Sequence, residues 1–241
     1  MKAALAVAAL LSGAAAPALA TAVYEYKPGE YVIVDQGQAP SNKLSIAAHG
    51  EGDMGEDNFH LYLMAEPAHR VIAPLDSIDS NAIFDSGPTA FHARWSPDSG
   101  HVAIIFRTDR HDLTMQLYEI GLDRARSRGG PTLLQAVNKK LNAAKDENYR
   151  LVANETELSW LSATQFMLTK HTLFQAKSPE LARALGAFAK QTADGHPQLD
   201  DNGKPIWPYF VEFSGQATGE FAPDGDYRLK ELKPGTFKGA N

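Results

Sequence analysis

Residues 91–121, FHARWSPDSGHVAIIFRTDRHDLTMQLYEIG, contain the clearest strand pattern in the chain. Apolar and polar residues alternate over 91–95, which predicts a strand with one apolar face. A Ser-Pro-Asp-Ser-Gly turn follows, in which Pro97 fixes φ and Gly100 is expected to take up a positive φ. Residues 101–106, HVAIIF, are apolar on both faces and rich in β-branched side chains, so we expect a strand covered on both sides. A polar turn then leads into a third strand over 113–120.

The order of these features resembles the blade repeat of TolB-type periplasmic β-propellers. The matching residues are Trp95-Ser-Pro-Asp98, the apolar run 104–106, Asp109-Arg110 and Leu117-Tyr118. The sequence departs from the repeat by placing the glycine one position late and by reversing the usual Arg-Asp order. The resemblance implies a blade-like antiparallel sheet. Because TolB-type propellers act through protein partners at the cell envelope, it also implies such a partner, but it transfers no catalytic residue.

A weaker copy of the same order covers residues 40–75, where His60-Leu-Tyr62 stands in the place of Gln116-Leu-Tyr118. Turn-like marks at Pro40, Pro97, Ala163 and Pro223 lie 57, 66 and 60 positions apart. These marks indicate repeated blades of unusual length. The alternative is a set of unrelated hairpin turns in an α+β domain, and the sequence leaves both open.

Two segments have helical patterns. Residues 133–145 carry an amphipathic stripe after a Gly-Gly-Pro break, and 178–191 begin with Ser178 as N-cap and Pro179 at the first helical position. Short strands are also expected over 23–26 and 31–34, with a polar loop over 36–42. We therefore expect a mainly β protein of antiparallel, propeller-blade-like sheets with two α-helices; the alternative is a single α+β domain.

Residues 1–20, MKAALAVAALLSGAAAPALA, have the basic start, apolar middle and Ala-x-Ala end of a secretory signal peptide. The mature chain is then expected to be 21–241, one β-rich domain that is periplasmic or secreted and has no membrane span. The chain of 241 residues has no cysteine, which excludes disulfides, a lipidated cysteine and a thiol nucleophile. Its net charge of −6, without a basic stripe, argues against nucleic-acid binding.

The densest group of potential metal ligands is HGEGDMGEDNFH, residues 49–60. Its oxygen and imidazole donors could hold a divalent cation, and its glycines would let the chain fold around the ion. The spacing fits neither an EF-hand loop nor a His-x-x-x-His zinc helix, so a solvated loop is the alternative. The candidate ligands are His49, Asp53, Glu56, Asp57 and His60.

We interpret two further polar groups and the three tryptophans as structural. The second histidine group comprises His92, His101, His111, Asp109 and Asp112, and the late loop contains Asp194, His196, Asp200, Asp201 and Asn202. The tryptophans are Trp95, Trp160 and Trp207. No Gly-x-Ser-x-Gly or Ser-x-x-Lys motif accompanies the second histidine group, so no nucleophile is available to it. The late loop could bind calcium, but ordinary turn chemistry explains it equally well. Tryptophans at strand positions are expected in the core rather than on a binding surface.

The function expected from these observations is that of an exported, non-catalytic binding or scaffolding protein with a protein partner at the cell envelope. It rests on the export signal, the repeat resemblance and the lack of a recognisable catalytic motif. The alternative is a secreted hydrolase that uses histidine and carboxylate groups, with or without a divalent cation. That alternative requires that His60→Ala or His111→Ala abolish an activity while the melting curve stays unchanged.

Overall fold

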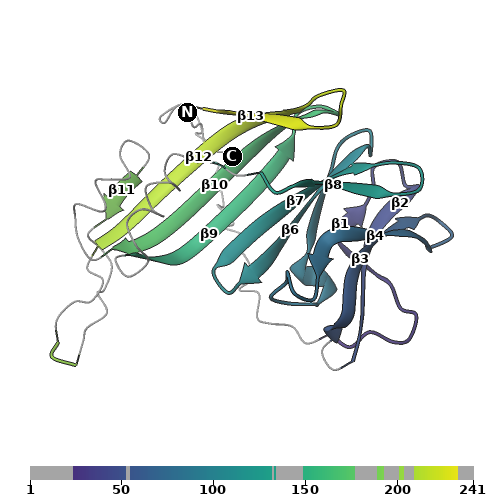
Figure 1. The fold of residues 1–241 in the computed structure, drawn as a ribbon, viewed down its shortest axis with the longest axis horizontal. Helices are drawn as coiled ribbons and strands as arrows, with labels where there is room; N and C mark the ends of the chain where they lie inside the picture. The colour runs from purple at the N-terminus through teal and green to yellow at the C-terminus, as the bar shows by residue number, and fades with distance from the viewer. Residues whose placement is uncertain are drawn as a thin grey trace, which may run out of the picture.

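Thirteen strands make up most of the described part of the computed structural model (Figure 1), and eleven of them follow one path of paired neighbours while the other two pair at its sides. It describes residues 24–52, 55–131, 133, 149–176, 189–192, 201–203 and 209–232. The strands are β1 (Val32–Gln38), β2 (Leu44–Glu51), β3 (Asp57–Ala65), β4 (Arg70–Asp79), β5 (His92–Trp95), β6 (His101–Asp109), β7 (Asp112–Ile120), β8 (Ala125–Gly129), β9 (Tyr149–Trp160), β10 (Gln165–Ala176), β11 (Ala189–Thr192), β12 (Tyr209–Phe221) and β13 (Tyr227–Glu231). The prediction of a mainly β protein is confirmed.

The strands form three antiparallel meanders in succession. The first meander is β1–β2–β3–β4 and the second is β5–β6–β7–β8. In the third meander, β9, β10 and β12 pair in turn, and β11 and β13 pair with different parts of β12. Single parallel pairs join the meanders, Asp35 with His92 and Asp112 with Asn154. The first strands β1, β5 and β9 therefore all run in the same direction.

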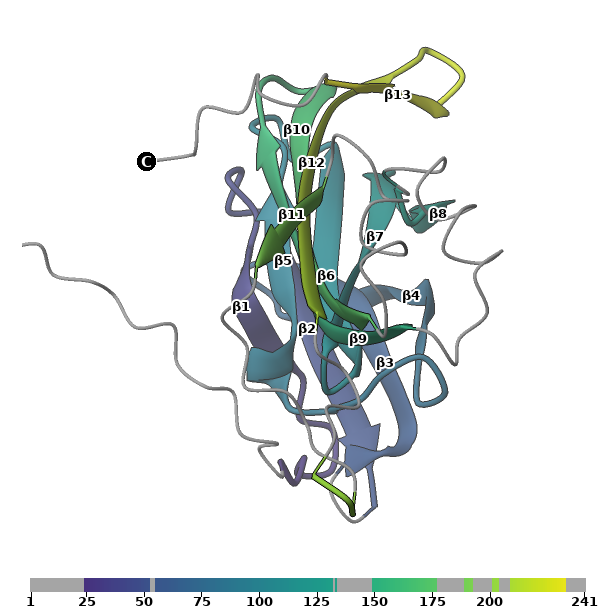
Figure 2. The ribbon, with the colours of Figure 1, turned by 90° about the vertical axis from the view of Figure 1, so that its left-hand side faces the viewer.

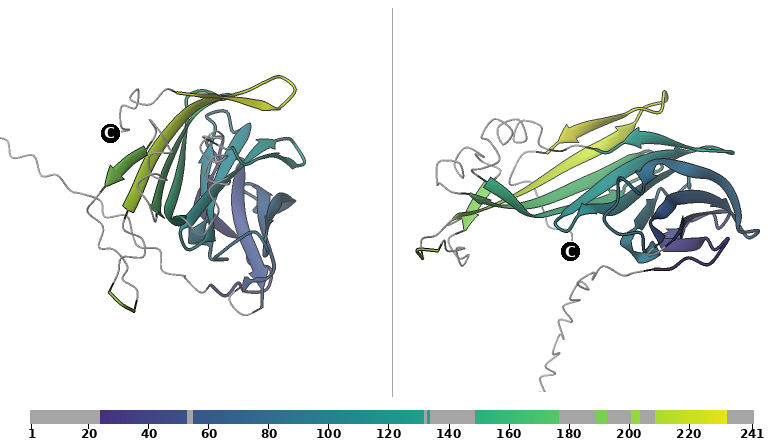
Figure 3. Two further views of the ribbon diagram at one scale, coloured as in Figure 1. Left: turned by 60° about the vertical axis from the view of Figure 1, so that its left-hand side comes forward. Right: turned by 60° about the horizontal axis from the view of Figure 1, so that its bottom comes forward.

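The meanders are stacked as layers (Figures 2 and 3). One buried apolar cluster lies between the first and second meanders and another lies between the second and third. The strands β9, β10 and β12 have 12, 12 and 13 residues and extend past the end of the second meander (Figures 1 and 3). The second meander is thus the middle layer and is covered on both faces.

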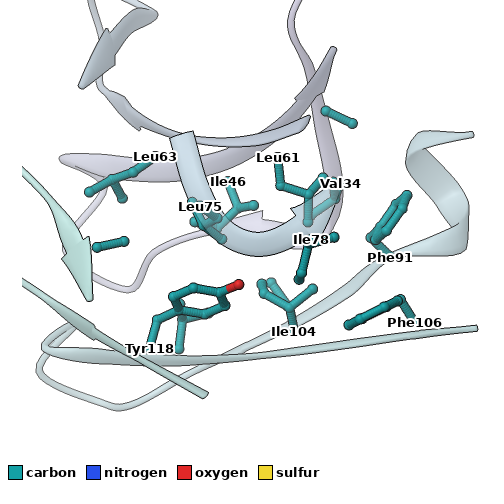
Figure 4. Packing of buried hydrophobic residues seen from close by; sticks show 14 of the residues in the cluster. Val34, Ile46, Leu61, Leu63, Leu75, Ile78, Phe91, Ile104, Phe106 and Tyr118 are labelled. Atoms are coloured by element: carbon teal, nitrogen blue, oxygen red, sulfur yellow. The ribbon is translucent and has the colours of Figure 1, made fainter. Parts of the chain in front are cut away.

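β6 shows how the sequence produces this stacking. Val102, Ile104 and Phe106 belong to the cluster shared with the first meander, whereas Ala103 and Ile105 belong to the cluster shared with the third. Figure 4 shows Ile104 and Phe106 below the side chains of the first meander, together with Tyr118, whose hydroxyl donates to the carbonyl of Asp76. Because successive strand residues point to opposite faces, an unbroken apolar run needs a cover on both sides. The expectation for residues 101–106 is confirmed.

The turn between β5 and β6 differs from the sequence expectation in one detail. Ser96 Oγ donates to Asp98 Oδ1 at 2.7 Å and accepts from the amide of His101 at 2.9 Å. The positive φ, 64°, is at Ser99 rather than at Gly100. The Ser99 side chain joins two meanders, because its Oγ accepts a hydrogen bond from the amide of Ser41 at 3.1 Å.

Three of the four turn-like marks occupy the same place in the fold. Pro40, Pro97 and Ala163 each lie in the turn between the first and second strands of a meander. Pro223 lies instead between β12 and β13, so its assignment as an equivalent mark is wrong. The spacing of the four marks along the chain therefore mixes turns between the first and second strands of a meander with the turn between β12 and β13.

The predicted helices fall mostly outside the described residues. Of 133–145 the structure describes Leu133 alone, which belongs to the cluster between the second and third meanders. Of 178–191 it describes 189–191, which lie in β11, so a helix reaching residue 191 is wrong. The expected strand over 23–26 is also wrong where it is described, and the expected loop over 36–42 begins only after Gln38. No helix in the described ranges has the length and apolar character that a membrane span needs.

Candidate functional site

A repeated tryptophan contact holds the first strands of the three meanders together. Trp95, the last residue of β5, donates its indole N–H to the carbonyl of Gly37 on β1 at 3.0 Å. Trp160, the last residue of β9, donates in the same way to the carbonyl of Arg94 on β5 at 2.8 Å. Each tryptophan therefore ties its own first strand to the first strand of the preceding meander.

A groove of about 550 Å³ runs along these three first strands. Its polar groups are the Gln36 and Gln38 amides and the Arg94 guanidinium, which donates to Gln36 Oε1 and to its neighbouring carbonyl on Ala93. Both indoles are partly exposed to the groove. Its lining residues are Gln36, Gln38, Pro40, Ala93, Arg94, Trp95, Pro97, Leu158, Ser159 and Trp160.

This combination of groups suits recognition of an extended polypeptide. Indole rings offer large apolar faces at a low cost in side-chain entropy, and a guanidinium or an amide can bond main-chain and side-chain acceptors. A hydrogen bond between His92 Nδ1 and Asp35 Oδ2, at 2.8 Å, fixes the parallel joint between β1 and β5 beside the groove. The groove walls are thus positioned by backbone pairing and by the two indole bonds.

The predicted metal group is only partly brought together. His49 and His60 lie opposite each other on β2 and β3. Glu56 and Asp57 are exposed before and at the start of β3, and Asp53 lies outside the described residues. Over the ranges that the structure describes, no cluster of three or more His, Asp or Glu side chains is placed to hold a metal ion.

His49 has a structural environment. Its Nδ1–H donates to the carbonyl of Glu30 at 2.6 Å, and its ring stacks on Tyr31 with centroids 4.6 Å apart. Tyr26 and Tyr62 pack against the same ring, and burial raises the pKa of both phenols. His49 is therefore part of an aromatic cluster on the outer face of the first meander.

The second histidine group is divided among three places. His92 pairs with Asp35 at the first strands. His101 stacks on Phe221 with ring centroids 4.2 Å apart and donates from Nδ1 to the carbonyl of Ala163, and burial lowers its pKa. His111 lies at the β6–β7 turn with Asp109 and Asp112. The structure does not assemble these five side chains into one site.

The late loop is largely outside the described residues. Asp194, His196 and Asp200 are among the residues that are not described, whereas Asp201 and Asn202 form an exposed turn. Trp207 also lies outside the described ranges, so its expected core position stays a prediction.

Sequence reasoning did not find the groove. The useful signal was present, because Trp95 and Trp160 lie two and three residues before the turn-like marks at Pro97 and Ala163. Both rings pack against the apolar clusters, as the sequence predicts, and both also line the groove. Gln36 and Gln38 were missed because β1 was expected to end at residue 34.

No protein-family model, curated protein or solved structure matches this chain.

Proposed function

We propose that this protein is an exported, non-catalytic binding or scaffolding protein of the cell envelope, and that it holds an extended segment of a protein partner in the groove along β1, β5 and β9. The observation that carries the proposal is the groove of about 550 Å³, which has two indoles and one guanidinium in its walls. Residues 1–20 support the exported location, because they have the order of features of a signal peptide.

The arrangement of the meanders supports a propeller-like interpretation. In β-propellers, four-stranded antiparallel sheets are arranged around a central channel. Here three meanders follow one another, and their first strands run in parallel beside the groove. In this proposal the meanders are blade-like units, as the TolB-type resemblance implies. The groove between their first strands corresponds to the central channel.

The proposal is tested with a pair of matched charge reversals. In Arg94→Glu the positive charge in the groove becomes negative, whereas Arg70→Glu makes the same change at an exposed position at the start of β4. The two variants and the unmodified protein are tagged and used to recover partners from an envelope extract, with identification by mass spectrometry. We expect one partner to be retained by the unmodified protein and by Arg70→Glu and lost with Arg94→Glu.

A blocking substitution separates groove occupancy from folding. Gln38 is exposed, so Gln38→Trp fills the groove without entering the core. If Gln38→Trp and Arg94→Glu both melt like the unmodified protein and recover the partner as well as it does, the interaction lies elsewhere and the proposed site is refuted.

The alternative of a metal-dependent secreted hydrolase is supported by one observation, the position of His49 directly opposite His60. Elemental analysis of the purified protein is the decisive measurement. A stoichiometric divalent ion that is lost in His60→Ala, with an unchanged melting curve, would favour this alternative over the binding protein.

A further inference from the structure

A second cavity, of about 350 Å³, lies at the turn between β6 and β7, where β9 passes it. Its lining includes three basic side chains, Arg107, Arg110 and His111, and two acidic ones, Asp112 and Glu155. Asn154 on β9 completes the polar wall. None of these residues lines the groove along the first strands.

The wall of this cavity is held by a network of hydrogen bonds. The amide of Asn154 donates to the carbonyl of His111 at 2.8 Å, and its side-chain Nδ2 donates to Asp112 Oδ1 at 2.5 Å. Thr172 is only 2% exposed and donates to Asn154 Oδ1 at 3.0 Å. The polar groups of the wall therefore have fixed positions between the second and third meanders.

Of the two acidic side chains of the cavity, Asp112 is held by several neighbours. Asp112 accepts at its second oxygen from Thr108 Oγ1 at 3.1 Å. The ammonium of Lys170, whose pKa burial lowers, also interacts with the Asp112 carboxylate. Glu155 Oε2 lies 3.9 Å from His171 Nδ1. With Asp112 held in this way, Arg110 and His111 are the exposed basic side chains at the opening of the cavity.

Arg107 carries the strongest indication of a missing partner. Its Nη1 donates to the carbonyl of Arg110 at 3.1 Å, but its Nε is buried and has no hydrogen-bond partner among the described residues. A buried donor without an acceptor is uncommon and unfavourable, so such a group calls for an explanation. A carboxylate supplies two oxygens in the plane of a guanidinium and can accept from two of its N–H groups at once.

We propose that this cavity binds a carboxylate group between the Arg107 guanidinium in its wall and Arg110 and His111 at the rim. The volume admits a small carboxylate or the end of a polypeptide. The carboxylate can thus come from a free small molecule or from the C-terminus of a protein. This inference is independent of the groove and of the partner proposed for it.

The test is calorimetric titration of the full-length protein with succinate, at constant ionic strength, with succinamide as the uncharged control. Arg107→Lys keeps the charge and removes the guanidinium fork, and Arg126→Lys makes the same change at an exposed position on β8. We expect saturable binding of succinate but not of succinamide. We expect Arg107→Lys to weaken it at least about tenfold, the loss of one good charge-assisted pair, and Arg126→Lys to leave it unchanged.

Absence of succinate binding to the unmodified protein, or equal affinity in the two lysine variants, would overturn the proposal. Should Arg107→Lys fail to fold, Arg110→Gln at the exposed rim replaces it, with the same expected loss. The source is resolved with N-acetyl-tetra-alanine, as the free acid and as the amide. Tighter binding of the free acid than of succinate assigns the cavity to a polypeptide end, and the reverse order assigns it to a free small molecule.

Discussion

Ser99 combines an unfavourable backbone conformation with a useful hydrogen bond. Its φ of 64° lies in the left-handed region, which costs a residue with a Cβ roughly 1 kcal/mol more than glycine. Its Oγ accepts from the amide of Ser41 across the joint between two meanders. The serine is therefore a compromise between local strain and a bond that connects two layers.

This compromise predicts an order of stability among three variants. Ser99→Ala loses the bond and keeps the strain, so it should lower the free energy of unfolding by about 1–2 kcal/mol. Ser99→Gly loses the same bond but relieves the strain, so it should lie about 1 kcal/mol above Ser99→Ala. Urea denaturation of the three proteins measures this. An alanine variant as stable as the glycine variant would show that the backbone at this position is not strained.

His101 predicts a loss of stability on mild acidification. Burial lowers its pKa, Arg128 acts in the same direction, and the carbonyl of Ala163 with the carboxylates of Asp98 and Glu119 partly opposes this. Because the folded pKa lies below the unfolded value of about 6.5, the stabilisation is complete above pH 6.5. It is lost as the pH falls from there through the folded pKa.

The matched variant is His101→Asn, which can still donate to the Ala163 carbonyl but does not titrate. Melting temperatures measured from pH 7.5 to pH 5 should fall more steeply for the unmodified protein than for His101→Asn. Parallel curves would assign the acid sensitivity to other groups.

At the scale of elements, the pairing of β10 with β12 depends on a glycine. Phe166 lies directly opposite Gly219, and a Cβ on Gly219 would come within 2.0 Å of the Phe166 ring. Phe166 is completely buried, so its ring cannot move aside cheaply. Gly219→Ala should therefore destabilise the protein by about 1–3 kcal/mol, as overpacking does.

The control for this change is Gly121→Ala. A Cβ on Gly121 would meet its nearest atom at 3.5 Å, which is an ordinary contact. Denaturation curves should thus leave Gly121→Ala within about 0.5 kcal/mol of the unmodified protein. Equal destabilisation by both substitutions would argue against close packing of Phe166 on β12.

The elements differ in how well the sequence predicts them, for physical reasons. β5, β6 and β7 were predicted because alternation and a two-sided apolar run are local patterns. β8 was missed because ARSRG is polar, and its strand conformation depends on pairing with β7. β11 lies where a helical stripe was expected, and its pairing with β12 overrides that local preference.

The candidate sites were less predictable than the strands. The groove depends on β5 pairing with β1 and on Trp160 of β9 reaching Arg94 of β5, and Gln36 and Trp160 are far apart in the chain. The metal group was predicted from proximity in sequence, yet strand pairing brings only His49 and His60 of that group opposite each other. Pairing between distant segments, which a single sequence does not encode locally, decides both outcomes.

At the scale of the whole molecule, stability depends on the stacking of three layers without any disulfide. The second meander has one buried face toward each neighbour, including Ala103, Ile105, Met115 and Leu117 toward the third. A fragment of residues 24–131 would expose this second face to water. We expect it to aggregate or to lack cooperative unfolding, as measured by size-exclusion chromatography and thermal circular dichroism.

A matched fragment tests the reason for that failure. Replacing Ile105, Met115 and Leu117 by serine makes the exposed face polar and leaves the cluster shared with the first meander intact. This fragment should stay monomeric to higher concentration. Two fragments that aggregate alike would show that the third meander supports the other two by something besides covering this face.

The two indole bonds between the first strands also supply the protein with an internal optical reporter. Trp95 and Trp160 have their N–H groups fixed on carbonyls, while their rings line the groove. A segment that enters the groove displaces water from both rings, so tryptophan emission should shift to shorter wavelength on binding. Gln38→Trp, which fills the groove, should abolish this shift. The same residues that connect the layers would then let binding be followed in solution without any added label.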